Sequence, residues 1–310
     1  SDRHLMALDP EGVLRGLRLA LAATGARHGF LALKEEATQA RAAVQAALGQ
    51  SGDVELVTVP SYYPMGDEFV LVEAVTGRNV PEGGLPLEAG VLVQNVATLS
   101  QIAQAQDGIP VTGRRLTVLG EVGRPCSLWV PIGTAVRQVL AWAGGLQRPE
   151  EDLAVVAGGA MMGRLVGLDA PTTKAMGALL VLPRRGPVVE MLSRPLAANL
   201  RRGRSACDQC RDCTEICPRY LLGHALRPHE IMRSINYGLD GPTRIVTAAA
   251  LCSECRLCEA YACPLGLSPL AYYRACKAEL RRQGWQNTVH RRTDVQPLAE
   301  RAFRRVPVHR

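Results

Sequence analysis

Eight of the ten cysteines in this 310-residue chain lie in two runs near its C-terminus. The first run has the pattern Cys-x2-Cys-x2-Cys-x3-Cys-Pro and comprises Cys207, Cys210, Cys213 and Cys217. The second run has the pattern Cys-x2-Cys-x2-Cys-x4-Cys-Pro and comprises Cys252, Cys255, Cys258 and Cys263. Three evenly spaced thiolates followed by a later Cys-Pro are typical of bacterial domains with two iron–sulfur clusters. The spacing therefore predicts two [4Fe–4S] clusters and electron transfer through them.

In two-cluster domains of this kind, the fourth cysteine of each run ligates the cluster of the other run. We therefore expect two ligand sets, which we call set A and set B. Set A consists of Cys207, Cys210, Cys213 and Cys263, and set B of Cys252, Cys255, Cys258 and Cys217. The second run has one residue more before its last cysteine, which predicts a one-residue bulge beside its cluster.

The main alternative for these cysteines is a pair of structural zinc sites, because Cys-x2-Cys pairs also bind zinc. Zinc usually draws its four ligands as two separated pairs, whereas each run here offers three evenly spaced cysteines and then Cys-Pro. Thiolate-ligated clusters persist in a reducing compartment, so we expect a cytoplasmic protein without disulfides. Cys126 and Cys276 lie outside both runs and are expected to pack as small apolar side chains.

The composition excludes several classes of function. Eight thiolates and two dipositive cluster cores would bring the formal charge from +7 to roughly +3, which argues against a nucleic-acid-binding protein. Nearly all the basic residues are arginine, without a phosphate-binding stripe. No stretch of about 18 uncharged apolar residues occurs, so we expect no transmembrane segment. The hydrophobic content of 47% is enough for buried cores.

The first hundred residues alternate between helix and strand patterns, which favours an α/β layer with a mostly parallel sheet. Asp9-Pro10 predicts the start of a helix and Gly25 its end. Further elements are expected as strands at 28–33, 54–59 and 90–93, and as helices at 35–48, from Asp67 to Thr76, and after Asn95. Strand-to-helix turns in such sheets bind ligands, and the helix N-terminus after Asn95 could contact a phosphate.

The pattern changes after Arg115 and predicts a small β-grasp domain. We expect paired strands at 116–121 and 126–131, a short helix capped by Thr134, and strands at 153–156, 164–166 and 180–183. Helices at 228–237 and 268–282 should flank the second cysteine run.

Several motifs together resemble the family of the C subunit of Rnf complexes. They are most similar to its branch of cobalamin reductases from propanediol-utilisation microcompartments and to relatives in glycyl-radical microcompartments. The resemblance covers nearly the whole chain, and Met65-Gly66-Asp67-Glu68 favours the microcompartment branch. Besides the cysteine runs, it is carried by Tyr63-Pro64-Met65-Gly66-Asp67-Glu68, Thr76-Gly77-Arg78, Gly83-Gly84-Leu85-Pro86, Val93-Gln94-Asn95-Val96, Gly159-Ala160-Met161-Met162-Gly163-Arg164 and Pro171-Thr172-Thr173-Lys174.

The resemblance implies three domains and a tail. Residues 1–110 would form the C-terminal part of a complex-I-type flavin-binding domain, a partial Rossmann-like α/β fold. Residues 111–195 would form a β-grasp domain of the soluble-ligand-binding (SLBB) type. Residues 196–284 would form an α+β ferredoxin domain with two [4Fe–4S] clusters, and residues 285–310 a basic C-terminal tail.

The resemblance also implies the cofactors and partners. NADH would reduce FMN, and the two clusters would carry the electrons to a corrinoid or a corrinoid enzyme. The family's FMN contacts correspond to Gly66, Asp67, Glu68, Asn95 and Thr98, and no catalytic side chain is assigned. Two alternatives stay open: a membrane-peripheral electron-transfer component of an Rnf-like complex, and a non-catalytic electron conduit docked on a microcompartment shell protein. A homo-oligomer is also left open.

The sequence departs from the family before the first of these motifs. Family members have a Gly-Arg-Gly-Gly-Ala-Gly-Phe loop and an Asn-x-x-Glu-Cys-Glu-Pro segment there, and this sequence contains neither. It also begins at Ser1 without an initiator methionine. We therefore expect a processed or truncated piece of a longer protein, one that binds its clusters but holds FMN weakly.

Overall fold

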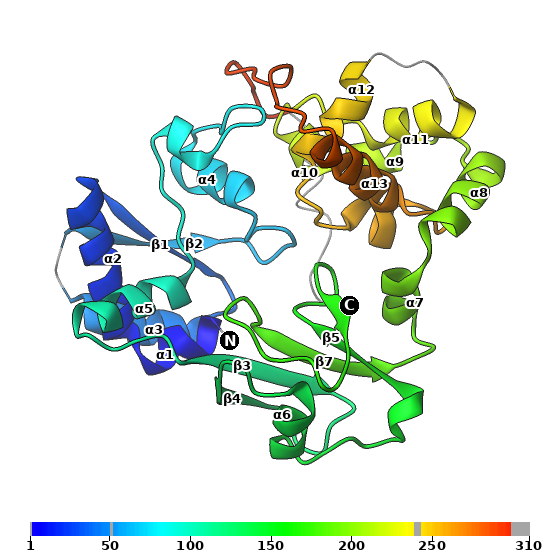
Figure 1. The fold of residues 1–310 in the computed structure, drawn as a ribbon. Helices are drawn as coiled ribbons and strands as arrows, with labels where there is room; N and C mark the ends of the chain where they lie inside the picture. Colours follow the sequence, from blue (N-terminus) through cyan, green and yellow to red (C-terminus); the bar gives the residue numbers. More distant parts are fainter. Residues whose placement is uncertain (1, 50–51, 239–242, 299–310) are drawn as a thin grey trace. The chain divides into compact units, whose positions relative to one another are not determined.

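The structure is a computed structural model, and it describes residues 2–49, 52–238 and 243–298 (Figure 1). The chain forms two compact units, each built from two separate stretches of sequence. The first unit contains Ser1–Val59 and Gln94–Ser193, and the second contains Pro60–Val93 and Arg194–Arg310. The segment Pro60–Val93 thus packs with the cysteine runs, although the sequence places it inside the flavin-binding part. The domain boundaries expected near residues 110, 195 and 284 remain predictions.

The α/β part of the first unit has a two-stranded parallel sheet in which Gly29 faces Val54. Asp9 caps helix α2 by accepting a hydrogen bond from the Gly12 amide, and Gly25 ends it in a left-handed conformation, as predicted. The elements are α1 (Asp2–Leu8), α2 (Pro10–Thr24), β1 (Gly29–Lys34), α3 (Thr38–Leu48), β2 (Val54–Val59) and α5 (Val96–Gln106).

Close helix packing holds this layer together. Helix α2 crosses α5 at Gly16, where an added Cβ would lie 1.8 Å from the Leu99 carbonyl oxygen. Only glycine fits there, because any side chain would collide with backbone. The core beneath the helices is aliphatic and includes Val13, Leu14, Leu31, Leu33 and Val44.

The prediction of a strand at 90–93 is wrong. Residues 86–89 form a short 3-10 helix, η1 (Pro86–Ala89), and Gly90 follows it with φ of 70°. The Val91 amide donates to the Pro86 carbonyl, 3.1 Å away, so the backbone closes a local turn and does not join a sheet.

The second half of the first unit is a five-stranded sheet with the order β4-β3-β7-β5-β6. Strand β3 pairs antiparallel with β4 and parallel with β7, which gives the mixed sheet of the predicted β-grasp domain. The described elements are β3 (Gly113–Gly120), β4 (Cys126–Pro131), α6 (Val136–Trp142), η2 (Glu150–Asp152), β5 (Leu153–Ala157), β6 (Arg164–Val166), β7 (Ala178–Pro183) and α7 (Pro187–Ser193).

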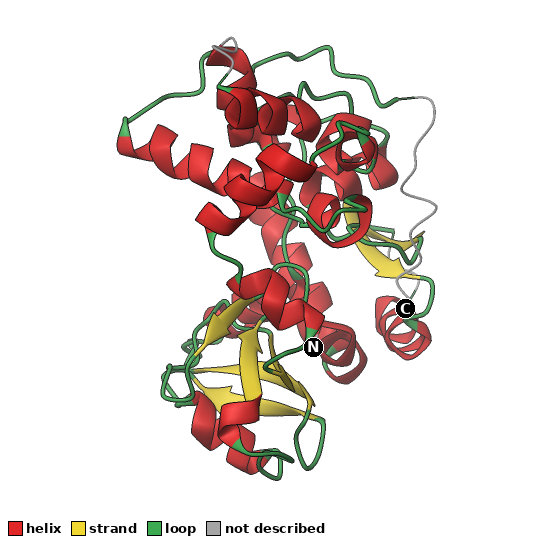
Figure 2. Ribbon diagram, turned by 90° about the vertical axis from the view of Figure 1, so that its right-hand side faces the viewer, coloured by secondary structure: helices red, strands yellow, loops and turns green. Residues whose placement is uncertain are grey.

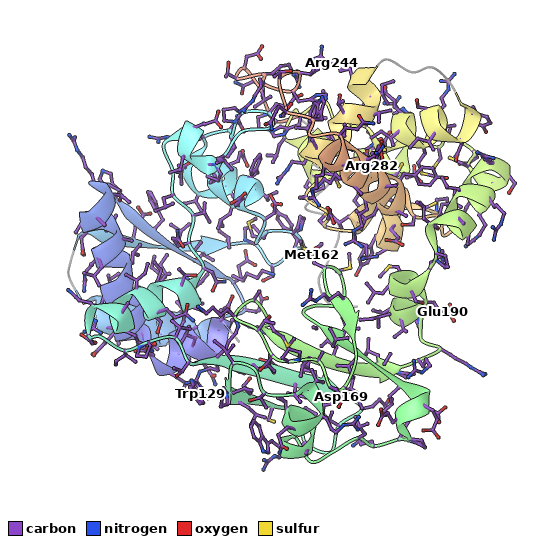
Figure 3. The ribbon with its side chains drawn as sticks, in the orientation of Figure 1. Trp129, Met162, Asp169, Glu190, Arg244 and Arg282 are labelled. Carbon is purple, nitrogen blue, oxygen red and sulfur yellow. The ribbon has the colours of Figure 1, made fainter. Side chains whose placement is uncertain are left out.

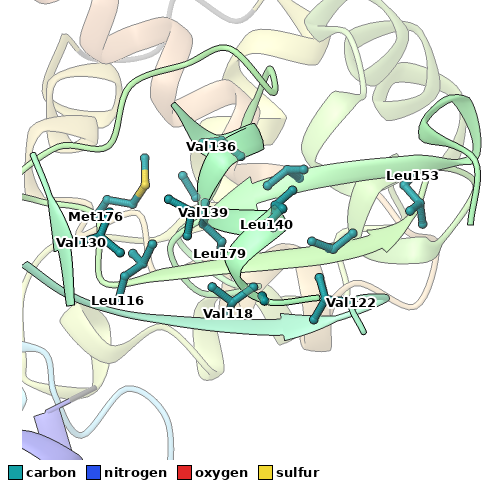
Figure 4. Close-up of a cluster of buried hydrophobic side chains, with 14 residues drawn as sticks. Leu116, Val118, Val122, Val130, Val136, Val139, Leu140, Leu153, Met176 and Leu179 are labelled. Carbon is teal, nitrogen blue, oxygen red and sulfur yellow. The ribbon is translucent and has the colours of Figure 1, made fainter. Parts of the chain in front are cut away.

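Helix α6 covers one face of this sheet. Val136, Val139 and Leu140 point from the helix onto Val118 and Leu179 (Figure 4). The helix begins one residue later than predicted, because Ala135 is its N-cap residue while the Thr134 hydroxyl donates to the Pro131 carbonyl. Cys126 is partly buried against this core, as expected.

Edge strand β4 carries a large exposed aromatic side chain, Trp129 (Figure 3). Its ring lies over Gly113 on β3, where an added Cβ would come within 2.1 Å of a ring carbon. The glycine therefore makes room for the indole across the strand pair.

The second unit consists of helices and loops (Figure 2). Its described residues contain no strand, so the α+β character expected for the cluster domain is not seen; short helices hold the cysteine loops instead. Its elements are α4 (Glu68–Thr76), η1, α8 (Leu196–Ala206), α9 (Asp212–Glu215), α10 (Pro218–Leu221), α11 (Pro228–Tyr237), α12 (Thr243–Thr247), η3 (Ala248–Leu251), the π-helix η4 (Cys258–Ala262) and α13 (Pro269–Arg282).

The core of this unit lies among the cysteine loops, α11 and α13. It includes Leu226, Ile231, Tyr272, Tyr273 and Cys276. Cys276 is 8% exposed and lies on α13, which confirms its expected packing role. The predicted tail is described only as far as residue 298, and its later part lies outside the described residues.

Candidate iron–sulfur centre

The two cysteine runs fold into the same loop twice. In each run, the second and fourth residues after the first cysteine have positive φ: Gln209 (60°) and Arg211 (74°) in one, Glu254 (59°) and Arg256 (69°) in the other. Among the described residues, these four are the non-glycine positions in this conformation. Left-handed residues alternating with ordinary ones turn backbone N–H groups toward one concave side, which suits an anionic group. The repeated geometry indicates two equivalent ligand loops.

The two runs differ in the helix that holds their third cysteine. Cys213 lies within α9 (Asp212–Glu215), whereas Cys258 begins the π-helix Cys258–Ala262. A π-helical turn accommodates one extra residue within a helix, and such turns are frequent at functional sites. This confirms the one-residue bulge predicted from the longer spacing. After it, Cys263 directly precedes a proline, as Cys217 does in the first run.

The structure gathers the four sulfurs of set A. Burial, followed by the neighbouring thiols of Cys210, Cys207 and Cys263, raises the pKa of the Cys213 thiol to about 12. All four set A cysteines also line one cavity. Cys263 therefore lies with the three cysteines of the other run.

The sulfurs of set B are gathered in the same way. Burial raises the pKa of Cys258 well above its ordinary value, and Cys252, Cys255 and Cys217 add to this rise, followed by Cys213 of set A. Cys255 and Cys252 likewise raise the pKa of Cys217, after burial. Cys217 therefore lies with the cysteines of the second run. This grouping of the sulfurs supports the crossed ligation that the sequence predicts. The ligation itself remains a prediction.

Hydrogen-bond donors already point at sulfur in both sets. The Gln209 side-chain amide lies 3.1 Å from Cys207 Sγ, and the backbone amides of Glu254 and Leu267 lie 3.3 Å from Cys252 Sγ and Cys263 Sγ respectively. Such bonds stabilise anionic sulfur and raise the reduction potential of a bound cluster.

An unused donor provides a test of whether clusters fit. The hydroxyl of Tyr273 is buried and has no hydrogen-bond partner within the described residues. The thiols that raise its pKa, after burial itself, belong to both sets: Cys217, Cys252, Cys258 and Cys213. A buried hydroxyl without a partner costs about 1–3 kcal/mol, so its presence between the sets fits an acceptor that a cluster would supply.

No three His, Cys, Asp or Glu side chains in the described ranges converge tightly enough to hold one metal ion. The four sulfurs of set A surround one cavity, which suits a four-iron cluster, whose ligand shell is wider than that of a single zinc ion. The donor set and its spacing therefore fit iron–sulfur clusters.

Charged side chains surround set B in pairs. Arg256 and Glu259 are almost fully buried and lie 2.8 Å apart. The Lys277 ammonium donates to the Cys252 carbonyl at 2.6 Å and pairs with Glu254 at 3.1 Å. Donors and cations of this kind stabilise the negative charge of a thiolate-bound cluster.

The segment Pro60–Val93 contacts the same region. The Tyr63 hydroxyl donates to the Cys255 carbonyl at 2.8 Å. The Asp67 carboxylate caps α4 and pairs with Arg219 at 2.6 Å, with both side chains largely buried. The guanidinium of Arg219 also lies 3.7 Å from the centroid of the Phe69 ring.

The structure divides the predicted flavin contacts between its two units. Gly66, Asp67 and Glu68 precede or begin α4 in the second unit. Asn95 and Thr98 lie in the first turn of α5 in the first unit, where Asn95 caps the helix and donates to Asp2 at 3.0 Å. Their role in binding FMN stays a prediction.

Sequence reasoning missed three side chains of the centre. Arg219 follows directly after Cys217-Pro218, which is a local signal that could have drawn attention to it. The contacts of Tyr63 and Tyr273 depend on packing between distant segments, and no sequence pattern indicates them.

A flavin-domain segment, a β-grasp sheet and two crossed cysteine sets define the class of iron–sulfur electron-transfer flavoproteins. Family models agree: the Nuo51 FMN-binding domain matches residues 1–104, the SLBB domain residues 115–165, and the 4Fe-4S dicluster domain residues 206–268.

The similar proteins identify the family more closely. Cobalamin reductase PduS of Salmonella typhimurium is 41% identical over 312 aligned residues, covering 100% of this chain and 67% of that protein. PduS of Citrobacter freundii is 43% identical, covering 90% of this chain and 62% of that protein. The chain belongs to the cobalamin reductase PduS family, and it spans roughly two thirds of the length of these two relatives.

More distant relatives extend the comparison. The C subunit of the Na(+)-translocating ferredoxin:NAD(+) oxidoreductase complex of Acetobacterium woodii is 33% identical, covering 71% of this chain and 47% of that protein. A chain of NAD+-reducing [NiFe]-hydrogenase in the H2-reduced state is similar in fold, with a TM-score of 0.52 and 23% identity, covering 94% of this chain and 55% of that one. Of the helices that the structure describes, none is both long and apolar enough to span a membrane.

Proposed function

We propose that this protein is an electron-transfer oxidoreductase that passes electrons from NADH, through FMN and two [4Fe–4S] clusters, to a corrinoid. One observation carries the proposal: the four cysteines of set A, three from the first run and one from the second, line one cavity. Cys213 of set A and Cys258 of set B also belong to one buried cluster with Leu270. Two redox groups held this close together serve the passage of electrons from one to the other.

The chain's own residues prepare this transfer. Sets A and B supply thiolates, the loop amides stabilise their charge, and the core around α13 excludes water from set B. When bound, the clusters supply one-electron transfer at potentials set by charge, hydrogen bonds and exposure. The protein therefore contributes placement and potential rather than acid–base chemistry.

The donor and the acceptor are inferred from the family. The match to the FMN-binding domain supports FMN as the entry point, and the relatives named cobalamin reductase support a corrinoid, or a corrinoid enzyme, as the acceptor. A place in the cytoplasm within a microcompartment, docking on a shell protein, and homo-oligomerisation belong to the same proposal. Copurification with shell proteins and sedimentation of the purified chain test the last two.

The first test is the content of the chain after anaerobic reconstitution. We expect about eight iron and eight sulfide per chain, the amount in two four-iron clusters. With photoreduced FMN as the donor, the chain should accelerate reduction of cob(III)alamin, and the double variant Cys217→Ser/Cys263→Ser should not. A preparation that holds zinc in place of iron, or cluster-loaded protein that leaves the corrinoid oxidised, would contradict the proposal.

A second candidate is a membrane-peripheral component of an Rnf-like complex. The 33% identity to the Acetobacterium woodii protein over 71% of this chain favours it. Copurification with membrane proteins of such a complex would support this candidate over the first. A non-catalytic conduit would instead bind clusters and dock on a shell protein without turning over NADH and a corrinoid.

A further inference from the structure

We propose that a segment after α13 forms a strap that joins the two cysteine runs at set B, with Glu82 as its positioning residue. The strap comprises residues 287–298 and is drawn in orange-red in Figure 1. The strap and all its partners below belong to the second unit. The inference rests on the proposed function, because the strap acts on the cluster that set B binds.

The strap is anchored by the carboxylate of Glu82, which is fully buried. His290 Nδ1 lies 3.3 Å from one carboxylate oxygen, and Arg292 Nε donates to the other at 2.7 Å. The Ala225 amide donates to that second oxygen at 3.3 Å, and the Glu82 amide donates to the Arg292 carbonyl at 2.9 Å. Hydrogen bonds to a charged group are roughly twice as strong as neutral ones. The carboxylate therefore joins the strap to the loop at 221–225.

One end of the strap reaches the loop that follows Cys217. The Leu298 amide donates to the Leu221 carbonyl at 2.9 Å. The Leu221 amide in turn donates to the Cys217 carbonyl, also at 2.9 Å. The Arg292 guanidinium donates to the Gly223 carbonyl at 2.6 Å. Two successive hydrogen bonds therefore connect the strap to the backbone of the fourth cysteine of set B.

The other end of the strap reaches the segment that leads into the second cysteine run. His290 Nε2 lies 3.0 Å from the Thr247 hydroxyl oxygen, and both residues are buried. Thr247 directly precedes helix η3, and Cys252 directly follows that helix. The strap thus holds the chain near Cys217 of one run and near Cys252 of the other, and both cysteines belong to set B.

Two glycines let the strap lie close to its partners. An added Cβ at Gly223 would come within 2.2 Å of the Gln296 carbonyl oxygen. An added Cβ at Gly83 would come within 2.2 Å of the side-chain nitrogen of Asn287. A side chain at Gly223 would therefore push the strap away from the loop that follows Cys217.

Set A is fastened by other contacts. The Arg202 guanidinium donates to the Leu265 carbonyl at 3.1 Å, and Arg194 donates to the Gly266 carbonyl. Both carbonyls lie within three residues of Cys263, and both arginines lie outside the strap. A change in the strap should therefore affect set B and spare set A.

The test measures how fast each cluster of the reconstituted 310-residue chain is lost to an excess of an iron chelator. Paramagnetic resonance of dithionite-reduced samples follows the two clusters, with their signals assigned from Cys210→Ser and Cys255→Ser. Glu82→Gln removes the charge that the strap bonds and should leave set A at the wild-type rate. It should speed loss of the set B cluster about tenfold, which corresponds to about 1.4 kcal/mol.

Gly223→Ala tests the strap without removing a charge. It should speed loss of the set B cluster by a similar factor, because the new methyl group collides with the strap. Gly77→Ala is the matched control. Both glycines have positive φ, 90° at Gly223 and 68° at Gly77, but no described atom lies within 4 Å of an added Cβ at Gly77. Gly77→Ala shares the backbone strain without the collision and should leave both rates unchanged.

Thr247 separates hydrogen bonding from packing. Thr247→Val keeps the shape of the side chain but removes the hydroxyl that His290 contacts, and should speed loss of set B. Thr247→Ser keeps the hydroxyl and should retain the wild-type rate. A role in packing alone would give the opposite order, because serine is the smaller residue.

The outcomes separate this inference from the proposed function. Equal acceleration of both clusters in Glu82→Gln, or equal rates in Gly223→Ala and Gly77→Ala, would overturn the role of the strap at set B and leave the proposed function intact. Wild-type rates in all of these variants would do the same. A wild-type chain that binds no iron–sulfur clusters would instead overturn the proposed function.

Discussion

Sets A and B are built from the same loop, yet they lie in different surroundings. Their loops share two left-handed positions each, and both receive a backbone amide on one of their sulfurs. Set B is buried among charge pairs and bonded to the Pro60–Val93 segment, whereas Cys210 of set A is exposed. Because charge, hydrogen bonds and exposure set the potential of a cluster, one duplicated loop can yield two different redox sites.

The comparison also shows where the two sets depend on each other. In the predicted ligation, each set takes its fourth cysteine from the other run, so neither site would form without the other run being folded. Metal binding is coupled to folding in such sites. We expect the second unit to assemble as a whole.

The largest expected effect tests this crossed arrangement. Cys217→Ser should remove the set B cluster and Cys263→Ser the set A cluster, each lowering the iron content from about eight to about four per chain. Paramagnetic resonance identifies which signal survives. If each variant lost the cluster held by its own run's triplet, the two sets would have to be redrawn.

The next effect concerns the buried pair beside set B. Arg219→Ala leaves Asp67 buried without its partner, and we expect a loss of about 3–5 kcal/mol in the free energy of unfolding. Denaturation in urea, followed by circular dichroism, measures it.

Arg202 is the matched control on the set A side. Its guanidinium bonds the Leu265 carbonyl from an exposed position, so Arg202→Ala should cost about 1 kcal/mol or less. Equal losses for the two variants would mean that the charge pair at set B has no special role in stability.

Acid should weaken the attachment of the Pro60–Val93 segment. His224 bonds the Val80 carbonyl, and burial, followed by the charge of Arg219, lowers the pKa of His224 to about 4. A histidine with a lowered folded pKa contributes stability above its ordinary pKa of 6.5 and loses it as pH falls toward 4. The expected loss is up to about 3 kcal/mol over this range.

The control for this pH dependence is an exposed histidine of the first unit. His224→Gln should flatten the fall in unfolding free energy between pH 6.5 and 4, and His28→Gln should leave it unchanged.

Below this pH range, the titration of Glu82 determines how the unfolding free energy changes with pH. Burial raises the pKa of Glu82, but hydrogen bonds from His290, Arg292 and the Ala225 amide outweigh it and lower the pKa to about 2, so its contribution is lost only between about pH 4.5 and 2. If the unfolding free energy fell equally in wild type and His224→Gln between pH 6.5 and 4, the assignment of this loss to His224 would be contradicted.

The smallest expected effect comes from Tyr273, whose hydroxyl lies near both sets. Tyr273→Phe removes a buried donor without a partner, so the cluster-free protein should be unchanged or about 1 kcal/mol more stable. The reconstituted protein should instead show a lower potential, more so for set B, because three of the four nearby thiols belong to it. A destabilised cluster-free variant with unchanged potentials would show that the hydroxyl serves packing only.

Much of the centre could be predicted from sequence because its signals are local. The cysteine spacing predicted two repeated loops and the extra residue that the π-helix Cys258–Ala262 accommodates. The helix capped by Asp9 and ended by Gly25 was also predicted, since capping residues act on their own neighbours. The strand expected at 90–93 failed because a short apolar stretch does not distinguish a strand from a turn.

The amino-acid sequence by itself determined which eight cysteines are predicted to bind iron and that the second run accommodates one residue more than the first. Only the tertiary structure decided that Tyr63 meets Cys255, 192 residues away, and that Asp67 meets Arg219, 152 residues away. Such partners are brought together by the packing of whole segments, and no spacing along the chain encodes them. The difference between sets A and B comes from this packing, because burial and neighbouring charge are properties of the folded unit. The spacing of the cysteines, in contrast, is a property of the sequence alone.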